Sequence, residues 1–81
     1  MIIQVLGPGC SRCNTLYEIV NKAVAETGVD AMVEKVHDIQ QIMAHNILMT
    51  PGLVIDGFVK VAGRVPSLEE VKKLIEAANA G

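Results

Sequence analysis

A short stretch that contains two cysteines constrains this chain most. Residues 7–13 read GPGCSRC, and Cys10 and Cys13 are the only two cysteines among 81 residues. An apolar run at residues 1–6 precedes the stretch, and a helical pattern follows it. At such a strand-to-helix junction the first sulfur lies at a helix N-terminus, where unpaired N–H groups and the helix dipole favour a thiolate. The second sulfur lies one turn further along the same face, so the pattern favours redox chemistry.

The hydrophobic pattern predicts seven elements in the order βαβαββα. Strands are expected at residues 1–6, 31–36, 53–55 and 58–61. Helices are expected from residue 10 or 11 to 27, from 39 to about 45, and from 67 onward. The first strand, helix and strand form a unit whose strands should be parallel, with a right-handed crossover. Charged Glu34 and Lys35 indicate that the second strand lies at a sheet edge.

Local signals support the second half of this order. Asp38 can cap the second helix and Asn46 can end it. The dipeptide at residues 56–57, Asp-Gly, favours a type I′ hairpin, which makes the last two strands antiparallel. Ser67 and Glu70 form a capping box at the start of the third helix. We therefore expect one α/β domain over residues 1–81, with a four-stranded mixed sheet and helices on both faces.

Composition excludes several classes of function. The net charge is −2 and the lysines are scattered among the acidic residues, so no basic stripe points to nucleic acid. No apolar run approaches the roughly 18 residues of a membrane span, and no leader pattern precedes the first strand. A disulfide within residues 10–13 would close only a tiny loop, which favours reactivity over stabilisation. We expect a cytoplasmic monomer that carries no cofactor.

The positions of residues at the cysteine stretch and before the third strand suggest a role for each. Cys10 is the expected nucleophile and Cys13 the thiol that resolves the mixed disulfide. Arg12 should favour the thiolate through its permanent positive charge. Thr50-Pro51, directly before the third strand, fits either a trans proline at the first strand position or a cis bond in a tight turn. With the cis bond, the backbone of Met49 and Thr50 could pair with an extended peptide that carries the target disulfide.

Three other readings of these residues stay open. The cysteines could be two small buried side chains without chemistry. They could bind copper or zinc, with His37 or His45 completing the site, although neither histidine lies at ligand spacing from them. The chain could also be a binding module that uses the same groove without electron transfer.

The sequence resembles the thioredoxin/glutaredoxin superfamily, and within it the small redox-active disulfide proteins with a thioredoxin-like fold. The resemblance covers the whole chain and rests on the motifs at residues 7–13, 50–51, 53–57 and 63–67. It implies a thiol–disulfide oxidoreductase that reduces protein disulfides, with Cys10 as nucleophile, Cys13 as resolving thiol and Pro51 as a cis-proline beside them. It also implies a disulfide-containing protein substrate and re-reduction by a flavin-dependent reductase.

Overall fold

A computed structural model describes residues 1–7, 11–45 and 49–80 of the chain. Its elements are β1 (Ile2–Leu6), α1 (Ser11–Thr27), β2 (Met32–Val36), α2 (Ile39–Ala44), β3 (Gly52–Ile55), β4 (Phe58–Ala62) and α3 (Leu68–Ala80). The predicted order is confirmed, and each predicted element end either agrees with the structure or differs from it by one residue. The expected helix end at Asn46 lies outside the described residues. Within the described ranges, no helix combines the length and the apolar character that crossing a membrane requires.

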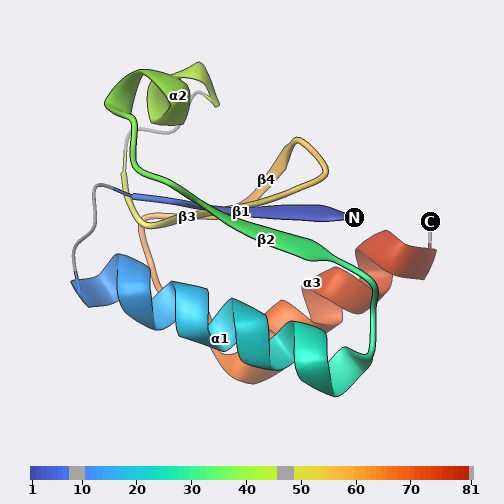
Figure 1. Cartoon of the computed structure of the whole chain (residues 1–81). Coiled ribbons are helices and arrows are strands. Elements are labelled where there is room, and N and C mark those ends of the chain that lie inside the picture. Colours follow the sequence, from blue (N-terminus) through green and yellow to red (C-terminus); the bar gives the residue numbers. More distant parts are fainter. Residues whose placement is uncertain (8–10, 46–48, 81) are drawn as a thin grey trace.

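The four strands form one mixed sheet in the order β2-β1-β3-β4 (Figure 1). β1 pairs with β2 in parallel and with β3 antiparallel, and β3 pairs with β4 antiparallel. The parallel first pair and the edge position of β2 are as predicted. Because β1 is central, its last residue, Leu6, pairs with both Val36 of β2 and Gly52 of β3. The end of β1 and the start of β3 therefore lie side by side at one end of the sheet.

The hairpin turn connects β3 to β4 and also holds the start of β1. Asp56 and Gly57 have φ angles of 49° and 86°, the two positive values that a type I′ turn requires. The Asp56 carboxylate accepts a hydrogen bond from the Ile2 amide at 2.8 Å, and the Asp56 amide donates to the Ile2 carbonyl at 2.8 Å. Asp56 thus fixes the hairpin against the central strand, a contact that the turn motif alone does not predict.

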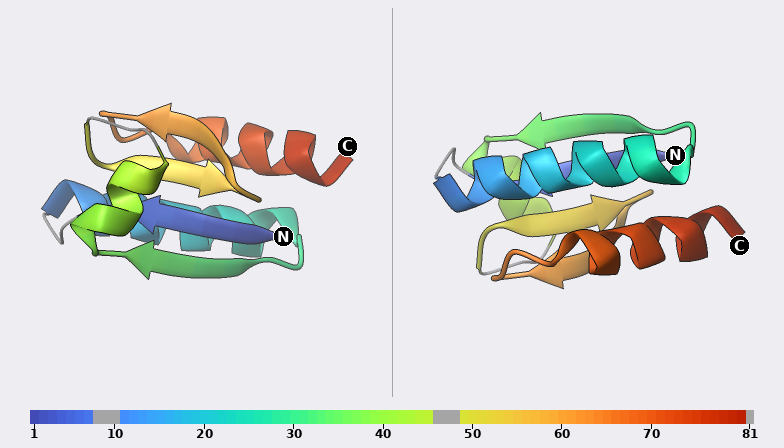
Figure 2. Two further views of the ribbon diagram at one scale, coloured as in Figure 1. Left: turned by 90° about the horizontal axis from the view of Figure 1, so that it is seen from above. Right: turned by 90° about the horizontal axis from the view of Figure 1, so that it is seen from below.

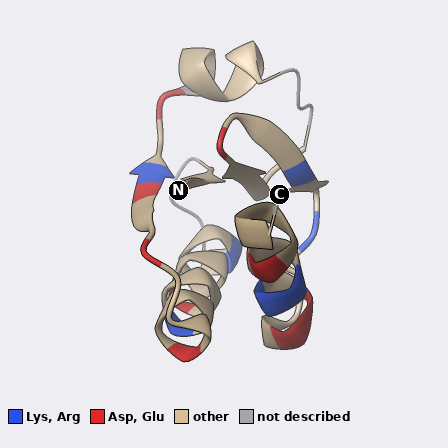
Figure 3. Cartoon of the chain, turned by 90° about the vertical axis from the view of Figure 1, so that its right-hand side faces the viewer, with Lys and Arg blue, Asp and Glu red and all other residues tan. Residues whose placement is uncertain are grey.

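The two faces of the sheet are covered unequally. α1 and α3 lie side by side on one face, and α2 crosses the other (Figure 2). Viewed along the sheet, the strands lie between α2 and the α1–α3 pair, and the charged residues of these two helices include both signs (Figure 3). The prediction of helices on both faces is confirmed.

The larger core lies between the sheet and the α1–α3 pair. Its buried residues are Ile3, Val5, Leu16, Val20, Ala23, Leu53, Ile55, Val61, Val71 and Ile75. Four residues form the smaller core under α2: Leu6, Val36, Ile42 and Val54. Residues alternate between the faces along β1, so Ile3 and Val5 belong to one core and Leu6 to the other. The short α2, capped by Asp38 through the Gln40 amide at 2.8 Å, covers only the end of its face where β1 and β2 finish.

Candidate active site

The cysteine stretch begins where β1 ends against the first turn of α1. The amide of Gly7 donates to the Val36 carbonyl at 2.9 Å, which continues the parallel pairing for one residue beyond β1. Cys13 lies in the first turn of α1, on the same buried face as Leu16, and only 4% of it is exposed. Its sulfur lies directly against Gly7. Cys10 lies outside the described residues.

The loop before β3 contains a cis peptide bond between Thr50 and Pro51. Of the two conformations that the sequence left open, this is the tight turn. Pro51 is buried, and its carbonyl accepts a hydrogen bond from the Gly63 amide at 2.9 Å. Because Leu6 pairs with Gly52, this turn lies beside the end of β1, at the end of the sheet where Gly7 begins the cysteine stretch.

Gly63 connects the proline turn to α1. It has a φ of 84°, a conformation that glycine adopts without steric cost. Its carbonyl accepts a hydrogen bond from the Arg12 guanidinium at 3.3 Å. The Met49 side chain packs over its Cα, with three atoms 3.1 to 3.3 Å from the point where a Cβ would stand, and Met49 is 63% exposed. Gly63 therefore brings Arg12, Met49 and Pro51 together, a role that the sequence motif at residues 63–67 did not predict.

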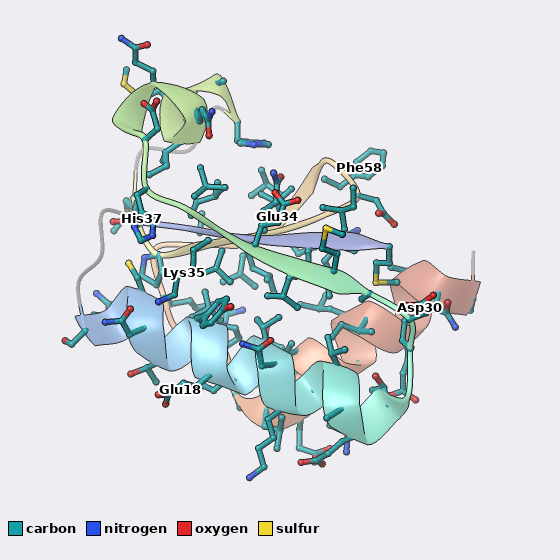
Figure 4. All side chains as sticks on the ribbon, viewed as in Figure 1. Glu18, Asp30, Glu34, Lys35, His37 and Phe58 are labelled. Atoms are coloured by element: carbon teal, nitrogen blue, oxygen red, sulfur yellow. The ribbon has the colours of Figure 1, made fainter. Side chains whose placement is uncertain are left out.

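Lys35 is a second contact that sequence reasoning missed. Its ammonium lies 4.5 Å from the centre of the Tyr17 ring and donates to the Asn14 side chain at 3.0 Å. Figure 4 shows Lys35 between β2 and α1, whereas Glu34 lies on the opposite side of the strand. The contact places a positive charge beside the first two turns of α1, next to the helix face that carries Cys13. The sequence gives only a weak signal for this contact, because the contact depends on how α1 packs against β2.

The segment from Gly63 to α3 is held by a two-point ion pair. The Arg64 guanidinium donates to both carboxylate oxygens of Glu70, one of them at 2.8 Å. The Glu70 amide donates to the Ser67 hydroxyl at 3.2 Å, which confirms the serine half of the capping box. Its carboxylate, however, binds Arg64. The hydrogen bond from Arg64 lowers the pKa of Glu70 below its ordinary value, and the positive charge of Arg64 adds to this effect.

The Glu70 carboxylate should make the stability of the fold depend on pH. Because its pKa is lower in the folded state, the ion pair stabilises the fold above the ordinary glutamate pKa. That contribution disappears as the pH falls through the folded-state pKa. We expect Glu70→Gln to lower the urea midpoint at neutral pH, and the difference from the wild type to vanish in acid. Glu69→Gln, in the same helical turn and 77% exposed, is the matched control and should change the midpoint less. Equal losses for the two variants, or a Glu70→Gln loss that persists in acid, would contradict the assignment.

The histidines lie on separate elements. His37 follows β2, and His45 caps α2 through its amide, which donates to the Ile42 carbonyl at 3.2 Å. Within residues 1–7, 11–45 and 49–80, no three histidine, cysteine or acidic side chains gather as metal ligands would. Cys10 lies outside these ranges.

Comparisons with known proteins agree with the geometry. Residues 1–76 match the family model described as a thioredoxin domain. The chain is 43% identical over 75 residues to a protein named thioredoxin from Methanothermobacter thermautotrophicus, which covers 93% of this chain and 97% of that protein. It is 40% identical over 77 residues to a protein named thioredoxin from Methanocaldococcus jannaschii, covering 95% of this chain and 88% of that protein. The structure has a parallel β1–β2 pair, a cysteine in the first turn of α1 and a cis-proline before β3. Because the matches also extend over nearly the whole length, the chain belongs to the thioredoxin-domain family.

Proposed function

We propose that this protein is a thiol–disulfide oxidoreductase that reduces protein disulfides with the Cys10–Cys13 pair. One observation carries the proposal: Cys13 is buried in the first turn of α1, at the same end of the sheet as the Thr50-Pro51 cis bond. The similarity to two proteins named thioredoxin supports the general activity. We further propose that it acts in the cytoplasm as a monomer, with residues 1–81 forming one domain.

The proposed reaction moves two electrons from the protein to its substrate. The Cys10 thiolate attacks one sulfur of the target disulfide, a mixed disulfide forms, and the other target sulfur leaves as a thiolate. The Cys13 thiolate then attacks the Cys10 sulfur. A Cys10–Cys13 disulfide forms, and the target leaves as a dithiol whose sulfurs take protons from solvent. A reductase, flavin-dependent by family analogy, returns two electrons to the pair.

The residues around Gly63 would hold the substrate. Met49 offers an exposed apolar side chain, and the backbone of Met49 and Thr50 precedes the proline turn as a pairing edge for an extended peptide. Arg12 is proposed to favour the Cys10 thiolate by its charge while its guanidinium also bonds to the Gly63 carbonyl.

A redox titration of the purified protein tests this function. We expect one two-electron transition in defined dithiol buffers, with two thiols lost on oxidation. Its midpoint should lie within the span of about −270 mV for reducing and −120 mV for oxidising members of this fold. Metal content is measured on the same sample. A stoichiometric metal with unreactive thiols would replace this proposal by thiolate metal binding, and unreactive thiols without metal would leave a binding module.

A further inference from the structure

Gly7 has no backbone reason to be glycine. Among the described residues, the glycines with positive φ are Gly28, Gly57 and Gly63, and Gly7 is not one of them. Its backbone continues β1 by donating to the neighbouring strand, as any residue other than proline could. The reason for glycine at position 7 must therefore lie in the space beside it.

The Cys13 sulfur fills that space. A Cβ built on Gly7 would stand 2.0 Å from the Cys13 Sγ and 3.0 Å from the Cys13 Cβ. Non-bonded heavy atoms approach to about 3.5–4.0 Å at optimal separation, so even one methyl group would collide with the sulfur. Adding a side chain at position 7 requires either the backbone or the sulfur to move.

Both backbones that flank this contact are anchored. Gly7 is hydrogen-bonded to Val36 at 2.9 Å. Cys13 belongs to a helix whose next buried residue, Leu16, is 0% exposed in the main core. The movable part is the Cys13 side chain. A helical residue has only two favourable χ1 wells, because the third clashes with the preceding turn, so a methyl on Gly7 would drive Sγ toward the other well.

We propose that Gly7 is a positioning residue for the Cys13 thiol: the absence of a side chain at position 7 creates the seat from which this sulfur closes the disulfide. This inference rests on the proposed function, since it assigns a part in the second step to a residue that carries no reactive group. Gly7 acts through Cys13 and leaves the first attack by Cys10 unchanged.

The test compares Gly7→Ala with the wild type by redox titration. With the sulfur displaced, the equilibrium constant for closing the Cys10–Cys13 disulfide should fall at least tenfold, which moves the midpoint by about 30 mV to more positive potential. Release of the target from the mixed disulfide should slow at least tenfold, while alkylation of Cys10 by iodoacetamide stays within twofold of the wild-type rate. A role confined to packing would lower stability in both redox forms alike and leave the midpoint in place.

Cys13→Ala supplies the matched background, because it removes the sulfur and leaves the helix backbone. In the wild-type background, Gly7→Ala should lower the urea midpoint by a large amount. In the Cys13→Ala background, the same substitution should lower the midpoint by at most half as much. If Gly7→Ala does not fold, the double variant decides: a folded double variant supports the seat, and an unfolded one contradicts it.

Two results would overturn the inference while the proposed function stands. One is an equal cost of the methyl group in both backgrounds, and the other is an unchanged midpoint in a folded Gly7→Ala protein. A wild type without any two-electron transition would instead remove the proposed function, so the two failures are distinguishable.

Discussion

Replacing Cys13 by serine should convert the protein into a covalent trap for its substrate. The Cys10 thiolate can still attack a disulfide, but a hydroxyl cannot resolve the mixed disulfide, because thiolates are the attacking species in this exchange. A well-placed intramolecular group acts at an effective concentration of roughly 10⁵ M or more, so its loss should slow turnover at least a hundredfold. With insulin as the probe disulfide, intact mass should show an adduct at Cys10 that persists until a reducing agent is added.

Cys10→Ser is the matched control for the trap. It keeps the buried Cys13, which is 4% exposed, and removes the proposed nucleophile. We expect no insulin adduct and turnover at the level of a double serine variant. An adduct on Cys13 in this variant would mean that the two roles are reversed, and full turnover would end the assignment of both.

Leu16→Ala should give the largest loss of stability among single core substitutions on α1. Leu16 is 0% exposed and lies one turn beyond Cys13 on the face that packs against the sheet. Truncating a buried leucine costs about 2–5 kcal/mol through lost transfer energy and the remaining cavity. For a domain of this size each kcal/mol corresponds to about 4–8 °C, so calorimetry of the reduced protein should show a melting temperature lower by at least ~8 °C.

Leu74→Ala makes the same chemical change at a partly buried position of α3. Its cost should stay below about 2 kcal/mol, because part of the truncated surface is already in contact with water. Equal losses of unfolding free energy for Leu16→Ala and Leu74→Ala would contradict the assignment of Leu16 to the fully buried face of α1.

Local interactions explain why the sequence predicted the elements so closely. The turn at Asp56 and Gly57 needs only two adjacent residues that tolerate positive φ, and both adopt it. Asp38 and Ser67 cap their helices through amides two and three residues away. Each of these signals and the interaction it produces lie within a few residues of chain.

The candidate site was predictable only in part. The two cysteines and Thr50-Pro51 stand out because their residue types are restrictive, although the sequence could not choose the cis bond that the structure contains. The Glu70 carboxylate illustrates the limit: the capping-box rule directs it to the local backbone, whereas Arg64, placed beside it by the segment that leaves β4, gives it two charged hydrogen bonds.

The sequence by itself determined the order of strands and helices, the hairpin and the helix starts, and it singled out the candidate redox residues, because patterns of a few residues encode each of these. The tertiary structure decided what surrounds those residues. Arg12 meets Gly63 across 51 positions of sequence because the sheet order β2-β1-β3-β4 places the end of β4 near the first turn of α1. The Cys13 sulfur meets Gly7 because α1 packs against the end of β1. Such contacts depend on how separate elements pack against one another, and a pattern of neighbouring residues does not encode which residues of two different elements will meet.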